Sequence, residues 1–122
     1  MKKLLIVDDE PSIVMSLEYL FKKENYEVFI ARDGTEAIEI AENSNIDIIL
    51  LDIMMPNVDG YQVLKYLKSN TNLKNIKVIF LSAKNKIVDI ELGLQLGADK
   101  YIAKPFSTKK LVKEVKELLK VS

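Results

Sequence analysis

The chain has 122 residues, the size of one ordinary domain, and 48% of them are hydrophobic, which is enough for a packed core. We therefore expect a single domain over residues 1–122 and exclude a disordered linker. The 18 Lys and Arg residues balance the 18 Asp and Glu residues, which argues against a protein that mainly holds nucleic-acid phosphates or a membrane surface.

The chain contains neither cysteine nor histidine. Disulfides, thiolate and imidazole metal ligands and Ser-His-Asp catalysis are therefore excluded, and a bound metal must be a hard ion held by oxygen, with Mg²⁺ the leading candidate. The apolar run from Leu4 to Val7 ends at Asp8, too early for an export signal. No segment has the roughly 20 apolar residues of a membrane span, so we expect a cytoplasmic protein.

The pattern along the chain predicts five strands that alternate with five helices. Short apolar runs predict strands at residues 3–7, 26–30, 46–51, 77–81 and 100–103. Helical spacing of apolar residues predicts helices at residues 11–23, 35–43, 60–69, 86–96 and 108–120. The third run is almost continuously apolar, as in a central strand buried on both faces. This alternation predicts an α/β fold, a (βα)5 parallel sheet with helices on both faces.

The last two predicted helices carry distinct patterns. In residues 86–96, Ile87, Ile90 and Leu94 lie on one stripe, and Val88 and Leu92 lie on another. In residues 108–120 an apolar stripe faces inward, and the other positions carry many lysines. We interpret them as a solvated face rather than a nucleic-acid site: Lys109, Lys110, Lys113, Lys116 and Lys120.

Polar residues follow the predicted strands at the edge where an open α/β sheet binds its ligands. They are Asp8, Asp9 and Glu10 after the first strand, residues 31–34 after the second, Asp52 after the third, Ser82 after the fourth, and Lys104 with Pro105 after the fifth. Because the carboxyl ends of parallel strands meet at one edge, we expect carboxylates, a hydroxyl and an ammonium group to converge there.

Three aspartates at one edge repel each other strongly. Two charges about 5 Å apart at an effective dielectric constant of about 20 repel by roughly 3 kcal/mol, and three such pairs approach roughly 10 kcal/mol. A fold with a stability of about 5–15 kcal/mol tolerates this only through protonation or a divalent cation. Mg²⁺ with phosphate oxygens fits the available ligands best.

The same residues suit phosphoryl transfer. Asp52 is a plausible nucleophile that would form an aspartyl phosphate. Lys104 would approach one phosphoryl oxygen as a compact cation, and Ser82 would donate its hydroxyl hydrogen to another. Taken singly, each residue has a plainer interpretation: Asp8 and Asp9 as helix caps, and Asp52 as a turn former.

Four segments carry a family resemblance, in order along nearly the whole chain: IVDDEP at 6–11, LLDIMMPNVDG at 50–60, LSAK at 81–84 and KYIAKPF at 100–106. Together they resemble the receiver domain of two-component response regulators. The resemblance implies the flavodoxin-like strand order 2-1-3-4-5, known from the chemotaxis receiver. It also implies a signalling switch rather than a conventional enzyme, one that catalyses its own phosphorylation and slow dephosphorylation.

The resemblance assigns roles residue by residue. Asp52 becomes the phosphoacceptor, charged by a sensor histidine kinase or phosphotransfer protein. Asp9 becomes a direct Mg²⁺ ligand with Asp8 beside it, and the backbone carbonyl of Met54 completes the metal shell. Lys104 would pair with the phosphate.

A further part of the resemblance concerns the switch. Ser82 matches the hydroxyl that moves toward the phosphoryl group, with the small Ala83 beside it leaving access. Tyr101 matches the aromatic residue that turns inward when the hydroxyl moves. The Lys104–Pro105 bond is expected to be cis, although only about 5–6% of X-Pro bonds are.

Other function classes fit less well. A magnesium-dependent phosphohydrolase would show Asp-x-Asp after the first strand, and a dinucleotide binder would need a glycine-rich turn there. A pseudo-receiver, which acts unphosphorylated as an interaction module, stays the alternative. A pseudo-receiver would normally have lost one of three features: the acidic pair Asp8 and Asp9, the aspartate Asp52, or the lysine Lys104. All three are present in this chain.

The segment GLQLGADKYIAKPFS at 93–107 resembles receivers of the winged-helix transcription-factor subfamily, which dimerise through the fourth helix, fifth strand and fifth helix. Ile90 and Lys110 stand where that subfamily commonly has arginine and glutamate, so one salt bridge cannot form. Lys100 with Glu114 would be a sign-reversed version of another, and Asp99 with Lys116 would be a third. A phosphorylation-dependent homodimer through residues 86–120 therefore stays open, beside a downstream effector domain or target protein. We expect no membrane and no direct nucleic-acid contact.

Overall fold

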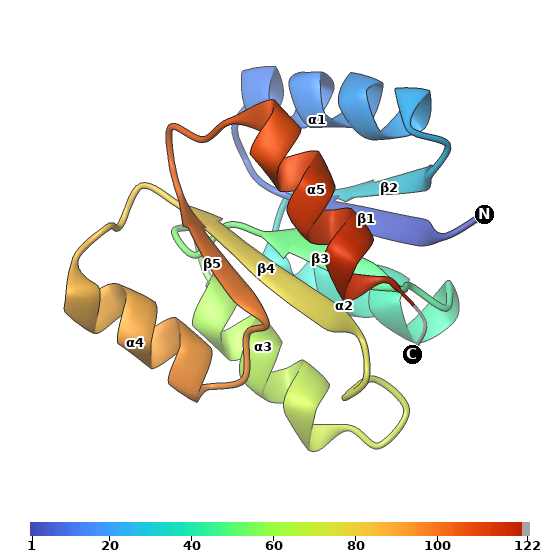
Figure 1. Ribbon diagram of the computed structural model, residues 1–122. Coiled ribbons are helices and arrows are strands. Elements are labelled where there is room, and N and C mark those ends of the chain that lie inside the picture. The colour runs from blue at the N-terminus through green and yellow to red at the C-terminus, as the bar shows by residue number, and fades with distance from the viewer. Residues whose placement is uncertain (121–122) are drawn as a thin grey trace.

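A computed structural model describes residues 1–120 and shows a five-stranded parallel sheet in the order β2-β1-β3-β4-β5 (Figure 1). The strands are β1 (Lys3–Val7), β2 (Glu27–Ala31), β3 (Ile48–Leu51), β4 (Lys77–Ser82) and β5 (Lys100–Ala103). The helices are α1 (Pro11–Lys23), α2 (Gly34–Asn43), α3 (Gly60–Ser69), α4 (Ile87–Gln95) and α5 (Thr108–Leu118). The α/β prediction and the flavodoxin-like strand order are confirmed. The expected domain range extends to residues 121–122, which lie outside the described residues.

The predicted elements agree with the observed ones to within one or two residues at their ends. The differences reach two residues at the end of α5, which stops at Leu118, and at the start of β3, where the apolar run from Ile46 enters the strand only at Ile48. Asp47 explains this, because its carboxylate accepts a hydrogen bond from the backbone N–H of Lys3 at 2.8 Å while its own N–H bonds the Lys3 carbonyl at 2.9 Å. Ile46 itself is buried although it precedes the strand.

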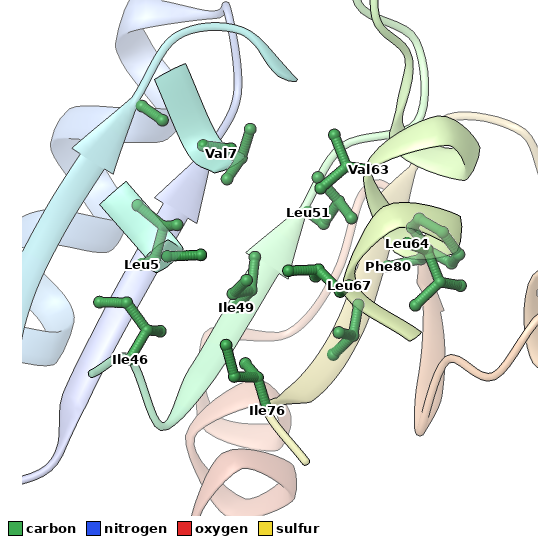
Figure 2. Close-up of a cluster of buried hydrophobic side chains, with 14 of the residues drawn as sticks. Leu5, Val7, Ile46, Ile49, Leu51, Val63, Leu64, Leu67, Ile76 and Phe80 are labelled. Carbon is green, nitrogen blue, oxygen red and sulfur yellow. The ribbon is translucent and has the colours of Figure 1, made fainter. Parts of the chain in front are cut away.

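Two hydrophobic cores cover the two faces of the sheet. One contains alternate strand residues such as Leu5, Ile49 and Phe80 and the inner sides of α2 and α3 (Figure 2). The other contains Leu4 and Ile48 with the inner sides of α1 and α5. Successive residues of a strand point to opposite faces, so every residue of β3 is buried from one side or the other.

Polar side chains fix where three of the helices begin. Asp33 caps α2 by accepting from the N–H of Glu36 at 2.8 Å, and Ser107 caps α5 by accepting from the N–H of Lys110 at 3.2 Å. Asp59 and Gln62 form a reciprocal capping box at the start of α3, with both bonds at 2.9 Å. Each cap satisfies N–H groups that the first helical turn leaves free.

Helix α4 has the fewest buried residues of the five helices. Its only buried residue is Gly93, and no side chain caps its first turn. A Cβ at Gly93 would lie 3.0 Å from the rings of both Phe80 and Tyr101, so the absent side chain lets the helix approach these rings. Both stripes predicted on this helix stay largely uncovered, with Ile87 72% exposed and Val88 68% exposed. Within residues 1–120, no helix combines the length and apolar character needed to cross a bilayer.

Candidate functional site

The three buried polar side chains in residues 1–120 all lie at the carboxyl edge of the sheet. Asp8 is 2% exposed, Asp52 is 5% exposed and Ser82 is fully buried. Asp8 directly follows β1, Asp52 directly follows β3, and Ser82 ends β4. Buried polar groups are costly unless they are paired, so their collection at one edge indicates a site.

Asp8, Asp9 and Asp52 converge there. Each offers one carboxylate oxygen, and these three atoms all lie within 4.8 Å of one another. Asp9 is exposed and leaves the cluster open to solvent, whereas Asp8 and Asp52 form its floor. An all-oxygen set with one open side fits a hard divalent cation such as Mg²⁺, which keeps several waters.

The interpretation of Asp8 and Asp9 as caps of α1 is wrong. The residue before α1 is Glu10, and no side chain accepts a hydrogen bond from the first turn, which Pro11 opens. Asp8 instead accepts from the N–H of Glu10 at 2.9 Å, which bends the chain locally and holds one of its oxygens. Its other oxygen faces Lys104.

Within residues 1–120, Lys104 is the only basic residue whose charged nitrogen lies within 4.0 Å of a carboxylate oxygen of this cluster. Its Nζ lies 2.9 Å from Asp8 Oδ2, 3.6 Å from Glu10 Oε1 and 3.9 Å from Asp52 Oδ1. Burial lowers the pKa of Lys104, but the hydrogen bond to Asp8 and the charge of Asp52 outweigh it and raise the pKa above its ordinary value. The lysine therefore stays charged. Its bond to Pro105 is cis.

The surroundings of Asp52 disfavour the charged form of its carboxylate. Burial, followed by the charge of Asp8, raises the pKa of Asp52 from 3.8 to about 6, although Lys104 and the N–H of Met54 act in the opposite direction. That N–H is 3.4 Å from Asp52 Oδ1, which is a weak hydrogen bond. An aspartate held in this way gains from any additional positive charge placed near it.

Ser82 and Tyr101 both bond the backbone of Lys84, a residue to which the sequence analysis assigned no role. Ser82 Oγ accepts from the backbone N–H of Lys84 at 3.1 Å, and the hydroxyl of Tyr101 donates to the carbonyl of Lys84 at 2.7 Å. The Tyr101 ring lies 5.9 Å from that of Phe80. Burial raises the pKa of Tyr101, so its hydroxyl stays protonated and able to donate.

Gly60 is a second residue to which the sequence analysis assigned no role in the site. It starts α3, and its N–H donates to the carbonyl of Ile53 at 3.0 Å. A Cβ at Gly60 would lie 2.5 Å from the carbonyl oxygen of Asp52, which is far too close. Only glycine lets α3 press against the backbone that carries Asp52. The aspartate–glycine pair at 59–60 was the available signal.

A parallel sheet in this order, with an acidic cluster, a lysine and a hydroxyl at its carboxyl edge, defines the receiver class of flavodoxin-like proteins. Residues 4–116 match the family described as the response regulator receiver domain. The chain belongs to this family and is a receiver domain of two-component signalling.

Known proteins resemble the chain in sequence and in structure. It is 43% identical over 121 residues to the alkaline phosphatase synthesis transcriptional regulatory protein PhoP of Bacillus subtilis, a match that covers 99% of this chain and 50% of that protein. The chain therefore spans half the length of this relative.

Two solved structures illustrate the structural similarity. The chemotaxis protein CheY4 of Vibrio cholerae superposes with a TM-score of 0.91 at 29% identity, covering 98% of this chain and 99% of that one. The receiver domain of the sensor histidine kinase PA1611 of Pseudomonas aeruginosa superposes with a TM-score of 0.88 at 30% identity, covering 96% of each chain, and has a magnesium ion coordinated in its active-site cleft.

Proposed function

We propose that the chain is a phosphorylation-dependent switch that accepts a phosphoryl group on Asp52 from a sensor histidine kinase or phosphotransfer protein. The observation that carries the proposal is the convergence of Asp8, Asp9 and Asp52, with oxygens within 4.8 Å, beside the ammonium group of Lys104. A purely structural edge gains nothing from buried carboxylates that repel one another.

Asp52, Lys104 and Ser82 would each have a separate role in the transfer step. An oxygen of Asp52 attacks phosphorus, the phosphorus–nitrogen bond of the donor phosphohistidine breaks, and an acyl phosphate forms on Asp52. Lys104, now 2.9 Å from Asp8, would turn to a phosphoryl oxygen, and the hydroxyl of Ser82 would donate to another. Water later attacks the phosphorus slowly, the bond between phosphorus and the Asp52 oxygen breaks, and inorganic phosphate leaves the restored carboxylate.

The acidic cluster would hold Mg²⁺ through Asp8, Asp9 and Asp52, with the backbone carbonyl of Met54 completing the set. When bound, Mg²⁺ supplies positive charge that offsets the repulsion among the carboxylates and the incoming phosphoryl oxygens. The raised pKa of Asp52, caused by burial and by Asp8, supports this fit, because it reports an unsatisfied negative site.

The output would begin at the backbone of Lys84. Ser82 accepts from its N–H and Tyr101 donates to its carbonyl, so a Ser82 hydroxyl drawn toward phosphate releases one bond and disturbs the other. The Tyr101 ring contacts Gly93 of α4, and the movement would therefore shift α4 and the surface formed by residues 86–120. The effect is a population shift between two arrangements.

Two partner surfaces follow from this arrangement. A cavity of about 590 Å³ opens beside Lys104, lined by α1 residues such as Ile13 and by Phe106, and is placed to receive the phosphate donor. Residues 86–120 would contact a downstream effector domain, a target protein or a second copy. The two lysines named for pairs between copies form ion pairs within one chain: Lys100 lies 3.2 Å from Glu114, and Lys116 lies 2.9 Å from Glu24 rather than beside Asp99.

Incubation with acetyl phosphate and Mg²⁺ followed by mass spectrometry tests the switch. We expect a base-labile gain of one phosphate on Asp52, absent without Mg²⁺ and absent in Asp52→Asn. If Asp52→Asn gains the same phosphate, the site is wrong. If the wild-type chain gains none from acetyl phosphate or from phosphorylated kinases, the alternative of a phosphorylation-independent interaction module replaces the switch.

A further inference from the structure

Glu10 lies beside the acidic cluster, and the transfer step described above uses none of its atoms. It stands directly before α1, where a side chain commonly caps the helix, but its carboxylate accepts no capping hydrogen bond. Serine, threonine, aspartate and asparagine are the residues that cap well at this position, and glutamate is not among them. The start of the helix therefore does not explain why a glutamate stands here.

The side chain of Glu10 faces Lys104 instead. Glu10 Oε1 lies 3.6 Å from Lys104 Nζ, and Glu10 forms no other ion pair within residues 1–120. The glutamate side chain is 58% exposed and the lysine side chain is 11% exposed. Glu10 is also not one of the three carboxylates that converge as a candidate metal site. It can therefore pair with Lys104 without being a metal ligand.

Asp8 already uses both of its carboxylate oxygens. Its Oδ1 accepts a hydrogen bond from the backbone N–H of Glu10 at 2.9 Å, and its Oδ2 lies 2.9 Å from Lys104 Nζ. A metal ion held by Asp8 would share that carboxylate with the ammonium group, and two positive charges so close together repel each other. Lys104 therefore needs a second partner if it is to stay in the site when Asp8 binds a metal ion.

The distances show which carboxylate is available to Lys104. Asp52 Oδ1 lies 3.9 Å from Lys104 Nζ, but Asp52 belongs to the same metal set and would carry the phosphoryl group. Glu10 Oε1 is nearer, at 3.6 Å, and lies outside that set. An ammonium group has three N–H donors, so Lys104 could bond Glu10 and a phosphoryl oxygen at the same time.

We propose that Glu10 is a positioning residue for the transfer reaction: Lys104 turns from Asp8 to Glu10 when Mg²⁺ binds, and Glu10 then holds the ammonium group beside Asp52. This role rests on the proposed function, because it assigns a further residue to the reaction at Asp52. Glu10 would act through Lys104 and would touch neither the metal ion nor the phosphoryl group.

Hydrogen exchange of the Lys104 ammonium group, measured by ¹⁵N NMR in the wild-type chain and in Glu10→Gln, tests the change of partner. Without Mg²⁺, Asp8 holds the lysine in both chains, so we expect exchange rates within about twofold of each other. With saturating Mg²⁺, exchange should be about threefold to fivefold faster in Glu10→Gln, as expected for the loss of one partly exposed ion pair. Equal rates with Mg²⁺, or the same acceleration without it, would overturn the proposal.

The Kd for Mg²⁺, measured by calorimetry, separates the contact with Lys104 from a general effect of charge. Glu10→Gln should raise this Kd about threefold to fivefold, because Lys104 then competes for Asp8 without an alternative partner. Glu18→Gln is the matched control, since Glu18 lines a hollow beside Asp8 but forms its ion pair with Lys22. It should change Kd less than about twofold, because charges without direct contact are screened.

A double-variant cycle shows whether the effect passes through the lysine. In a chain that carries Lys104→Met, adding Glu10→Gln should change the Kd for Mg²⁺ less than about twofold. Equal losses at Glu10 and Glu18, or a loss at Glu10 that persists without the lysine, would overturn the positioning role.

Phosphorylation by acetyl phosphate separates this role from the proposed function. At saturating Mg²⁺, Glu10→Gln should lower the rate constant for phosphorylation of Asp52 about threefold to fivefold. An unchanged rate, or phosphorylation of Asp52 with no metal-dependent change at Lys104, would overturn the role of Glu10 alone. A change at Lys104 in a chain that accepts no phosphate would overturn the switch alone. A chain that binds no Mg²⁺ would overturn the role of Glu10 whatever its phosphorylation.

Discussion

Helices α3 and α4 are close in length and cover the same face of the sheet, yet the structure holds them very differently. Helix α3 buries Val63, Leu64 and Leu67, starts with a capping box and presses Gly60 against the backbone of Asp52. Helix α4 buries one glycine and has no side-chain cap. The helix beside Asp52 is therefore firmly packed, and the helix beside Tyr101 is loosely held. Loose elements are the ones that a small change in free energy can move.

The largest expected effect comes from comparing the truncation of a leucine in each helix, buried in α3 and exposed in α4. Leu64→Ala should lower the free energy of unfolding by about 2–5 kcal/mol, because it removes a fully buried side chain and leaves a cavity. Leu92→Ala, at a residue 43% exposed, should cost less than about 1 kcal/mol. Urea unfolding monitored by circular dichroism measures both. Equal losses would show that α4 is packed as firmly as α3.

A second prediction concerns the negative charge of Asp52, the residue whose backbone α3 contacts at Gly60. In the absence of Mg²⁺, Asp52→Asn should raise the free energy of unfolding at pH 7.5 by up to about 3 kcal/mol, since about two pKa units correspond to that energy. The pKa of Asp52, raised mainly by burial from 3.8 to about 6, lies above its unfolded value. The contribution of Asp52 to the stability of the wild-type chain therefore falls as pH rises from about 4 to above 6.

The pH dependence supplies the control for that variant. At pH 4 the folded wild-type chain already carries a protonated Asp52, so the advantage of Asp52→Asn should largely disappear. Thermal melts across pH 4–8 in chelator measure the difference. An advantage that stays constant with pH would mean that the carboxylate is not the source of the strain.

The third comparison is between the two helix starts. Asp59→Ala breaks the capping box and should cost about 0.5–2 kcal/mol, the usual value of an N-cap. Lys86→Ala, at the uncapped start of α4, should change stability by less than about 0.5 kcal/mol. Chemical denaturation gives both values. A larger loss from Lys86→Ala would indicate that the start of α4 is held by contacts of the lysine.

The smallest expected effect concerns backbone dynamics and compares amide hydrogen exchange in α3 and α4. Tyr101→Phe removes the hydroxyl that donates to the Lys84 carbonyl at 2.7 Å and should cost about 1 kcal/mol. Amide hydrogen exchange should speed up in α4 and stay unchanged in α3. Phe80→Leu, which loosens a buried ring shared by both helices, is the contrasting variant. Uniform exchange after Tyr101→Phe would contradict a specific link to α4.

The sequence could predict the fold because its elements are local. Apolar runs of four to six residues and helical spacing between them place all five strands and all five helices to within one or two residues. The strand order came from the family resemblance and was confirmed. The positions of Asp8, Asp52 and Ser82 followed as well, because parallel strands end at the same edge.

Residue type and strand periodicity are enough to predict which residues stand at the carboxyl edge and which ligand chemistry they offer. Which of these residues touch one another is a property of the folded chain. In the fold Lys104 pairs with Asp8, Ser82 and Tyr101 both bond the backbone of Lys84, Gly60 packs against Asp52, and α4 stays largely exposed. These contacts link residues up to 96 positions apart. Their geometry depends on how the helices settle against the sheet, and no local pattern of side chains encodes that.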